Sequence, residues 1–151
     1  MEAAPARIAA YLEEIGAESE RRGEREWTVR VPSHKRGEVG AAIVLGERTV
    51  TIRTFFLRGP DRGHEDVYRR LLRKNLETYS WRFALDDDGD IFLLAQAPAA
   101  TLTADALDEL LGTLATLVDE TYESVVRLGF VVPEGTEFRP PPAQEGSPGG
   151  R

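Results

Sequence analysis

The stretch WRFALDDDGDIFLLA, residues 81–95, predicts two short strands joined by a tight turn. Trp81, Phe83 and Leu85 share one face of the first strand, and residues 91–97 form the second. The Asp-Gly sequence between them suits the tip of a hairpin, because Asp tolerates and Gly readily adopts positive φ. We expect the rest of the chain to pack against this hairpin.

The acidic turn, residues 86–90, can also be compared with a calcium-binding loop. An EF-hand loop has glycine at its sixth position and a bidentate glutamate at its twelfth. With Gly89 in the glycine position, the first ligand falls on Ala84 and the twelfth on Ala95, and neither can coordinate an ion. We therefore assign the aspartates to turn formation, with an adventitious cation as the alternative, and predict no metal site.

A long amphipathic helix is predicted after the hairpin, from Thr103 to Leu128. Thr103 is a suitable N-cap, and acidic residues in the following turn favour the positive end of the helix dipole. Gly129 is suited to the carboxyl end. The apolar stripe of this helix comprises Leu107, Leu110, Leu111, Leu114, Val118, Tyr122, Val125 and Leu128.

The first half of the chain alternates between helical and strand periodicity. The predicted elements are a helix at 4–21, strands at 26–31, 39–45 and 49–57, and a second helix at 65–76. With the hairpin and the long helix, the order is α-β-β-β-α-β-β-α. This order predicts an α+β fold with a five-stranded antiparallel sheet, whose main face is covered by two helices.

The strand at 49–57 is apolar on both faces near its end. Val50, Ile52 and Phe56 share one face, whereas Phe55 and Leu57 fall on the other. We expect another element or another subunit to cover the second face. Phe55 and Leu57 are therefore candidate partner-binding residues.

The second helix has two distinct sides at 100° per residue. Its apolar side consists of Val67, Tyr68, Leu71, Leu72 and Leu76. Its basic side consists of Arg69, Arg70, Arg73 and Lys74, a candidate surface for a protein partner or for an anion. Asn75 falls on the apolar side, where an unpaired amide would cost about 1–3 kcal/mol. We therefore expect Asn75 to hydrogen-bond to neighbouring backbone.

Length and composition suit one domain followed by a tail. The chain has 151 residues, of which 41% are hydrophobic, so we assign residues 1–132 to a single α+β domain. Residues 133–151 are rich in proline and glycine and predict a disordered or polyproline-II tail. The chain has no cysteine, no apolar run of the ~20 residues that a membrane span needs, and no recognisable export signal. These features predict a cytoplasmic protein without disulfides.

The net charge of −7 argues against general affinity for nucleic acid, which requires a basic surface. The charge is unevenly distributed. Residues 1–75 carry 15 basic and 12 acidic side chains, whereas residues 76–151 carry 4 and 14. The opposite net charges of the two halves would favour association with a partner or a second copy. The alternative is that both sets of charged side chains are simply exposed to solvent.

Sequence motifs of common catalytic sites are absent. The chain has no Gly-x-Ser-x-Gly, no glycine-rich phosphate-binding loop and no His-Glu-x-x-His. Its histidines, His34 and His64, lie in separate predicted loops. An acid–base pair of carboxylates would need a cleft that shifts their pKa values. We therefore predict no enzymatic activity, no catalytic residue and no cofactor.

Four sequence blocks resemble the YbjN-domain family in its actinobacterial form. They are residues 65–76 (EDVYRRLLRKNL), 83–93 (FALDDDGDIFL), 107–112 (LDELLG) and 128–130 (LGF). The resemblance covers most of residues 5–130 and involves core, turn and cap positions. It implies a fold similar to type III secretion chaperones, frequent dimerisation, and binding of partner proteins. It further implies a sensory-transduction or stress-linked regulator, and it supplies no catalytic residues.

The sequence therefore favours a non-enzymatic adaptor or chaperone-like regulator that binds an unidentified protein and forms a homodimer. The alternative is a ligand-responsive sensor, in which the basic face of residues 69–74 or the loop at 59–63 holds a small anionic metabolite. A third hypothesis pairs the basic helix of one copy with the acidic long helix of another. Such a dimer would weaken as salt is added.

Overall fold

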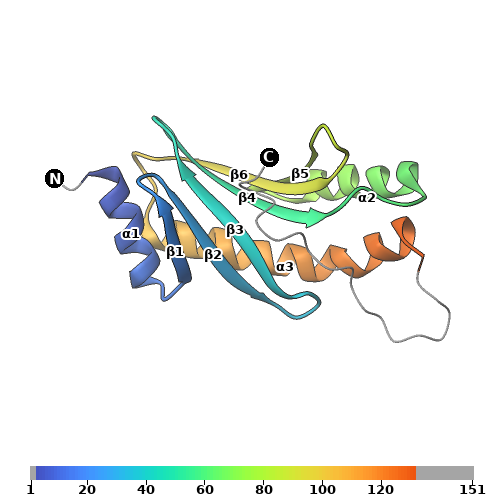
Figure 1. The fold of residues 1–151 in the computed structure, drawn as a ribbon, viewed down its shortest axis with the longest axis horizontal. Coiled ribbons are helices and arrows are strands. Elements are labelled where there is room, and N and C mark those ends of the chain that lie inside the picture. Colours follow the sequence, from blue (N-terminus) through green and yellow to red (C-terminus); the bar gives the residue numbers. More distant parts are fainter. Residues whose placement is uncertain (1–2, 132–151) are drawn as a thin grey trace.

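The computed structural model describes residues 3–131, which form three helices and six strands (Figure 1). The elements are α1 (Ala4–Glu14), β1 (Glu18–Gly23), β2 (Glu26–Ser33), β3 (Gly37–Leu45), β4 (Thr49–Leu57), α2 (His64–Glu77), β5 (Trp81–Leu85), β6 (Ile91–Pro98) and α3 (Ala104–Gly129). The predicted α+β class and antiparallel sheet are confirmed, but the sheet has six strands rather than five. The predicted tail, residues 133–151, lies outside the described residues.

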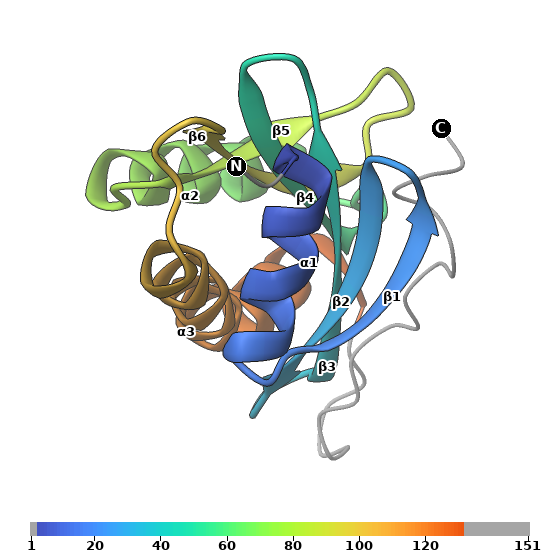
Figure 2. The ribbon, with the colours of Figure 1, turned by 90° about the vertical axis from the view of Figure 1, so that its left-hand side faces the viewer.

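The strands form one antiparallel sheet in the order β1-β2-β3-β4-β6-β5. Figure 2 shows the sheet curving around one side of the molecule, with the three helices on its inner face. Helix α3 runs along the whole sheet, as its predicted length required (Figure 1). Among residues 3–131, no helix combines the length and apolarity that a membrane crossing requires.

A row of buried side chains crosses five strands and forms the centre of the core. The row consists of Trp27, Ile43, Ile52, Ala95 and Trp81, which are cross-strand neighbours and at most 2% exposed. Such neighbours pack directly because residues opposite each other on antiparallel strands share a face. Trp81 Nε1 also donates a hydrogen bond of 3.0 Å to the Leu110 carbonyl, which fixes α3 to the β5 end of the sheet.

The additional strand, β1, replaces part of the first predicted helix. That helix ends at Glu14, because Gly16 adopts φ of 70° and the amides of Gly16 and Ala17 donate to the carbonyls of Glu13 and Leu12. This pattern is a Schellman C-cap. The prediction of a helix up to residue 21 is therefore wrong. Every residue of β1 is exposed, so no apolar periodicity marked it as a strand.

A β-bulge in β4 changes which face its last residues occupy. Phe55 is opposite Phe92, but Leu57 is opposite Ile91, so Phe56 is an extra residue in the ladder. Because side chains alternate between faces, one extra residue reverses the alternation. Leu57 consequently joins the core and is only 2% exposed, and the prediction that it lies on the outer face is wrong. Arg36 donates to the Phe55 and Phe56 carbonyls at this irregularity.

The start of α2 is fixed against the end of α3. Gly63 has φ of 61°, and a Cβ there would lie 2.6 Å from the Leu128 carbonyl oxygen. A Cβ on Gly129 would meet Pro60 and Val67 at 3.1 Å. Gly129 is thus required for close approach and is the last residue of α3, rather than a cap beyond it as predicted. These contacts determine which face of α2 reaches solvent.

Candidate functional site

Helix α2 lies at one end of the sheet, where it contacts α3 and β5 (Figure 1). Only Val67 and Leu71 of its predicted apolar side are buried. Leu72 and Leu76 instead point to solvent and are 67% and 89% exposed. The apolar side that the sequence predicts is therefore wider than the surface that the fold covers.

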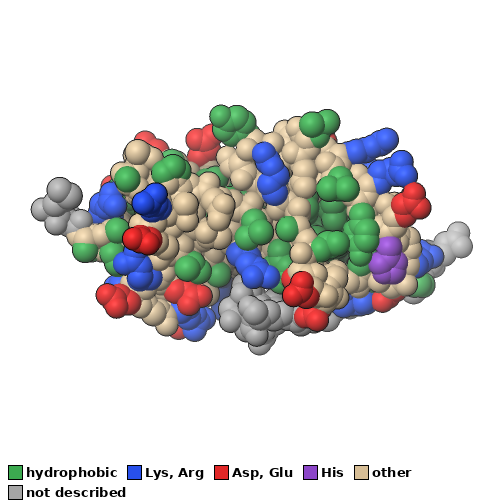
Figure 3. Space-filling model, turned by 90° about the horizontal axis from the view of Figure 1, so that it is seen from above, with side chains coloured by type: hydrophobic (Ala, Val, Ile, Leu, Met, Phe, Trp, Pro, Cys, Tyr) green, Lys and Arg blue, Asp and Glu red, His purple; other side chains and the backbone are tan. Residues whose placement is uncertain are grey.

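The exposed Leu72 and Leu76 continue the half-buried Tyr68, because the three residues follow one another at intervals of four along α2. We call these three residues the α2 stripe. They line a shallow hollow whose borders are Glu65, Arg69 and Arg73. Figure 3 views the molecule from above and shows hydrophobic side chains gathered on this surface, with basic side chains near them. Exposed leucines at this spacing are typical of a protein-binding surface.

The four predicted basic residues lie together on α2, but they differ in their partners. Arg69 forms an ion pair of 2.9 Å with Glu65 on the same helix, and Lys74 forms one of 3.3 Å with Glu120 of α3. Within residues 3–131, Arg70 and Arg73 form no ion pair. All four line a groove between α2 and α3, together with acidic residues of both helices.

Asn75 ties α2 to the edge of the sheet, which confirms the expectation from sequence. Its side-chain amide donates to the Phe83 carbonyl at 3.1 Å, and its oxygen accepts from the Phe83 amide at 2.7 Å. This reciprocal pair imitates the bonds that a neighbouring strand would form. Thr78 Oγ1 also donates to the Trp81 carbonyl at 2.6 Å. At Trp81 and Phe83, side chains of Thr78 and Asn75 therefore bind the backbone groups on the outer edge of β5.

The other two predicted residues, Phe55 and Leu57, do not line the α2 surface. Leu57 belongs to the core, as described above, and Phe55 is 6% exposed. The Phe55 ring packs edge-on against Phe92, with ring centroids 5.5 Å apart. The candidate surface predicted from sequence thus separates into basic residues on α2, of which Lys74 is half-buried, and buried residues on the sheet.

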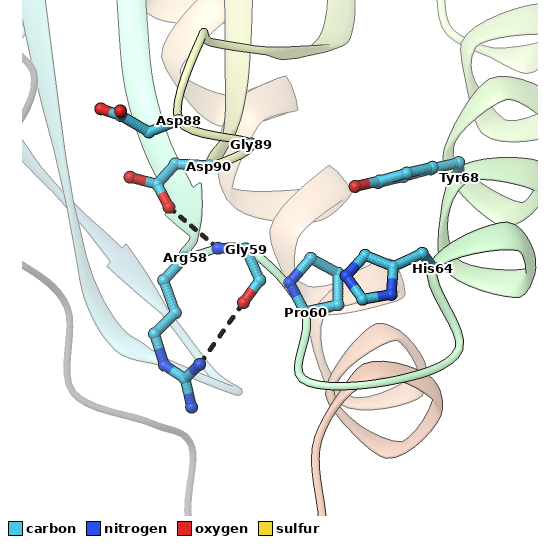
Figure 4. A pocket seen from close by; sticks show the side chains of 8 residues that line it. All are labelled: Arg58, Gly59, Pro60, His64, Tyr68, Asp88, Gly89 and Asp90. Carbon is cyan, nitrogen blue, oxygen red and sulfur yellow. Dashed lines mark hydrogen bonds between the residues drawn. The ribbon is translucent and has the colours of Figure 1, made fainter.

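The aspartates of the acidic hairpin turn stabilise the turn itself and a neighbouring loop through hydrogen bonds. Asp86 Oδ1 accepts hydrogen bonds from the amides of Asp88 and Asp90, and Asp90 Oδ1 accepts from the Gly59 amide at 2.9 Å. The close-up in Figure 4 shows the latter bond at the wall of a pocket that Tyr68 also lines. Carboxylate oxygens of Asp86, Asp88 and Asp90 lie within 4.8 Å of one another. Their hydrogen bonds confirm the assignment to turn formation.

Acidic residues on the outer face of α3 form hydrogen bonds and ion pairs with other parts of the same chain. Asp119 Oδ1 accepts from Ser33 Oγ at 2.6 Å and from the Lys35 amide at 3.1 Å. Burial opposes ionisation of Asp119, but these hydrogen bonds outweigh it and lower its pKa. Glu123 pairs with Arg127 and Lys35, which lower its pKa. With Glu120 bound to Lys74, little of this face is left for the basic helix of a second copy.

Comparison with known families decides the affiliation of the chain. The model of the YbjN family, described as "Putative bacterial sensory transduction regulator", matches residues 4–127. The chain belongs to the YbjN family. It is 35% identical over 102 residues to the uncharacterized protein Rv0487 of Mycobacterium tuberculosis, which covers 68% of this chain and 56% of that protein. It is 33% identical over 102 residues to the uncharacterized protein ML2442 of Mycobacterium leprae, covering 55% of that protein. The chain thus spans little more than half the length of these relatives.

Solved structures with the same fold include chains from a type III secretion system. A chain of the ExoU-SpcU complex of Pseudomonas aeruginosa matches with a TM-score of 0.54 at 22% identity, covering 80% of this chain and 96% of that chain. A chain of the ExsC-ExsE complex matches with a TM-score of 0.53 at 23% identity, covering 87% and 95%. The expected similarity of the fold to type III secretion chaperones is confirmed for this YbjN-family chain.

The sequence prediction of the site missed the exposure of Leu72 and Leu76. One signal could have revealed it. The apolar residues of α2 extend over about half of the helix circumference, whereas a helix at the end of a sheet buries a narrower stripe. In this YbjN-family chain, Leu72 and Leu76 lie in the part of the apolar side that the fold leaves uncovered, and they are the most exposed apolar residues of α2.

Proposed function

We propose that this YbjN-family chain is a non-enzymatic, protein-binding adaptor of the chaperone-like type. The observation that carries the proposal is the α2 stripe, in which Leu72 and Leu76 are exposed on a regular, well-anchored helix. Contiguous exposed apolar surface is unfavourable in water unless another protein covers it. The aspartates of the acidic turn accept hydrogen bonds from the backbone of the turn and of Gly59, which supports a structural role for them over a catalytic one.

The comparisons support this proposal in two ways. The family description supports a role in signalling, and a link to stress follows only from the resemblance of the sequence. Chains of the same fold occur in complexes with other proteins, including the type III secretion chaperone SycH with a fragment of YscM2. We further propose that the chain acts in the cytoplasm as a homodimer that binds a partner protein.

Affinity capture with matched variants tests the adaptor. The tagged full chain, the variant Leu72→Ser with Leu76→Ser, and the control Leu85→Ser would be incubated with native lysate, and bound proteins quantified by mass spectrometry. Leu85 is also exposed, at 48%, but lies on β5 outside the α2 stripe. We expect the double variant to lose a protein that the chain and the control retain. Equal recovery by all three would refute the α2 stripe as the binding surface.

A second candidate function is a sensor of a small anionic metabolite, and the groove between α2 and α3 favours it. Arg70 and Arg73 line this groove beside Arg69 and Lys74. Clustered guanidinium groups bind phosphate and carboxylate well. Acidic side chains in the same groove, including Glu120, oppose such binding, so the adaptor remains the leading proposal.

Thermal shift measurements test the sensor directly. Inorganic phosphate, pyrophosphate and citrate would be added at matched ionic strength to the full chain and to a variant with Arg69, Arg70 and Arg73 replaced by Gln. A sensor would be stabilised by one of these anions, and the triple variant would not. A control with Arg21, Arg22 and Arg30 replaced by Gln should keep the shift. An identical shift in both variants would rule out this groove.

A further inference from the structure

The outer face of the sheet carries an aromatic pair that none of the described helices covers. Phe55 and Phe92 are cross-strand neighbours on this face, with ring centroids 5.5 Å apart, and we call them the outer-face pair. The three helices all lie on the inner face (Figure 2). The two rings are nevertheless only 6% and 1% exposed. The cover that the sequence predicts for Phe55 must therefore extend over Phe92 as well.

Two arginines supply part of this cover. The Arg36 guanidinium lies 5.9 Å from the centroid of the Phe55 ring, and that of Arg53 lies 3.9 Å from the centroid of the Phe92 ring. Arg36 donates to two backbone carbonyls of β4. In contrast, Arg53 Nε is buried without an acceptor, and Arg53 forms no ion pair in the described part of the chain. A buried donor is unfavourable unless an acceptor reaches it, so a carboxylate is the group that Arg53 would bind.

A second arginine adds positive charge beside the outer-face pair. Arg53 of β4 and Arg82 of β5 are both cross-strand neighbours of Leu94, one on each side of it. Arg82 donates to backbone carbonyls at the start of β5, and it also forms no ion pair within residues 3–131. The surface thus combines two aromatic rings with two guanidinium groups that lack carboxylate partners there. An occupant that fits it has an aromatic side chain next to carboxylates.

The chain itself contains a segment with this chemistry shortly after α3. Residues 134–139 have the sequence EGTEFR, in which Phe138 follows Glu137 directly and Glu134 lies three residues before that. No other part of the sequence after α3 contains an aromatic residue beyond Phe130. The segment therefore matches both the rings and the guanidinium groups of the outer face.

The segment also starts close enough to reach the outer-face pair. At the end of α3, the Phe130 ring lies 4.4 Å from the Arg58 guanidinium. Arg58 directly follows β4 and is three residues after Phe55. Phe138 is eight residues beyond Phe130, and eight extended residues span up to about 26 Å. The distance from the end of α3 to Phe55 is therefore well within the reach of the segment.

We infer that residues 134–139 of this chain cover the outer-face pair, with Phe138 against the rings and Glu137 paired with Arg53. For these residues the inference departs from the disordered tail that the sequence predicts. The segment lies outside residues 4–127, which the family model matches, so this cover is a feature of this chain beyond the matched family region. A partner protein would reach the outer face only by displacing the segment, which thus acts as an internal competitor.

Cysteine pairs in the full chain test the position of the segment, because the chain contains no cysteine. Thr136→Cys leaves Phe138 and Glu137 unchanged, and Ala84→Cys places the second thiol at the cross-strand neighbour of Phe92. A short bismaleimide should join the two within one chain, as detected by peptide mass spectrometry. Adding Phe138→Ser should abolish most of this cross-link, because it removes the anchor.

The matched control pairs Thr136→Cys with Val44→Cys. Val44 lies on the same outer face and is 42% exposed, but it belongs to β3 and lies away from the outer-face pair. A segment fixed on the outer-face pair should give little cross-linking to Val44, whereas a freely moving segment would reach both thiols.

Charge exchange tests the ion pair without a cross-linker. Arg53→Glu and Glu137→Arg should each lower the melting temperature by about 1–4 °C, and the combined variant should lose less than the sum of the two shifts. Glu145→Arg makes the same charge change outside the segment. Its effect should simply add to that of Arg53→Glu.

Four outcomes would overturn the inference: equal cross-linking to Ala84 and Val44, a cross-link that survives Phe138→Ser, additive charge variants, and cross-links formed only between chains. The last would make a second copy the occupant. A purified chain without the cross-link, which gains protection of the outer face only when a partner protein is added, would assign the face to that partner. None of these variants alters the α2 stripe, so the capture experiment with Leu72 and Leu76 stands or fails separately.

Discussion

Helices α2 and α3 are both amphipathic in sequence, yet the fold treats their apolar sides differently. On α3 the apolar stripe is buried along the helix, and Leu107, Leu114 and Val118 have no measurable exposure. On α2 only Val67 and Leu71 are buried. The difference arises because α3 lies across the sheet, whereas α2 packs mainly against α3 and the β5 end. Amphipathicity therefore predicts a helix reliably, but the neighbours decide how much of its apolar side becomes core.

The largest expected difference between the two helices is in the cost of truncating a leucine. Leu114→Ala on α3 should lower the free energy of unfolding by about 2–5 kcal/mol, because it leaves a cavity in the core. Leu72→Ala on α2 is the matched control, with the same chemical change at a 67% exposed site. Urea unfolding followed by tryptophan fluorescence measures both. Comparable losses at the two sites would mean that the contrast between the helices is wrong.

The next effect concerns the bond that holds α2 to the sheet. Asn75→Ala should cost about 1–3 kcal/mol, because the amide and carbonyl of Phe83 lose the side chain that satisfies them. Asn75→Asp is an informative control, since a carboxylate still accepts from the Phe83 amide but cannot donate to its carbonyl. We expect it to fall between the wild type and Asn75→Ala. Hydrogen exchange of the Phe83 amide should accelerate in Asn75→Ala and less in Asn75→Asp, which keeps the acceptor. An unchanged rate in Asn75→Ala would contradict this anchoring role.

A smaller effect is expected from removing the α2 stripe itself. In dilute solution, where the chain is dissociated from any partner, Leu72→Ser and Leu76→Ser should each change the free energy of unfolding by no more than about 0.5 kcal/mol. Chemical denaturation at several protein concentrations measures this. A large loss that does not depend on concentration would show that these leucines support the fold of the single chain.

The smallest effect concerns the pH dependence contributed by α3. The folded pKa of Asp119 lies below its value of about 3.9 in an unfolded chain, so its ionised form stabilises the fold above that pH. This stabilisation is lost as the pH falls through the folded pKa. Asp119→Asn should therefore be less stable than the wild type near neutrality, and the two should converge in acid. Thermal unfolding from pH 2 to 7 measures the convergence.

Asp108→Asn is the matched control for that experiment, because Asp108 lies on the exposed side of the same helix. It makes the same change from carboxylate to amide but leaves the hydrogen bonds of Asp119 to Ser33 and Lys35 in place. If Asp119→Asn also ran parallel to the wild type down to pH 2, the link between Asp119 and Ser33 would contribute nothing to stability.

Much of the fold could be predicted from local patterns. The alternation in β2, the burial of Trp81 and Phe83 in β5, the Thr103 cap and the turn aspartates agree with the structure, because each depends on residues close together in the chain. Leu85, predicted on the same face as Trp81 and Phe83, is instead 48% exposed at the end of β5. The Thr103 hydroxyl accepts from the Ala106 amide as an N-cap should. Asn75 was also predictable, since an amide on an apolar helix side needs partners.

Strand β1, the bulge in β4 and the exposed part of α2 were decided by tertiary structure. Strand β1 has no apolar residue to mark it, and forms because β2 offers an edge with which it can pair. The bulge places Leu57 in the core through its pairing with Ile91, far away in the sequence.

The sequence by itself determined the existence of the three helices, most strands and the turns, because periodicity and capping act over a few neighbouring residues. Only the tertiary structure decided that Leu72 and Leu76 remain exposed and that Leu57 does not. The reason is physical: burial depends on which distant elements cover a side chain. On α2, the neighbouring elements cover Val67 and Leu71 but do not extend over Leu72 and Leu76.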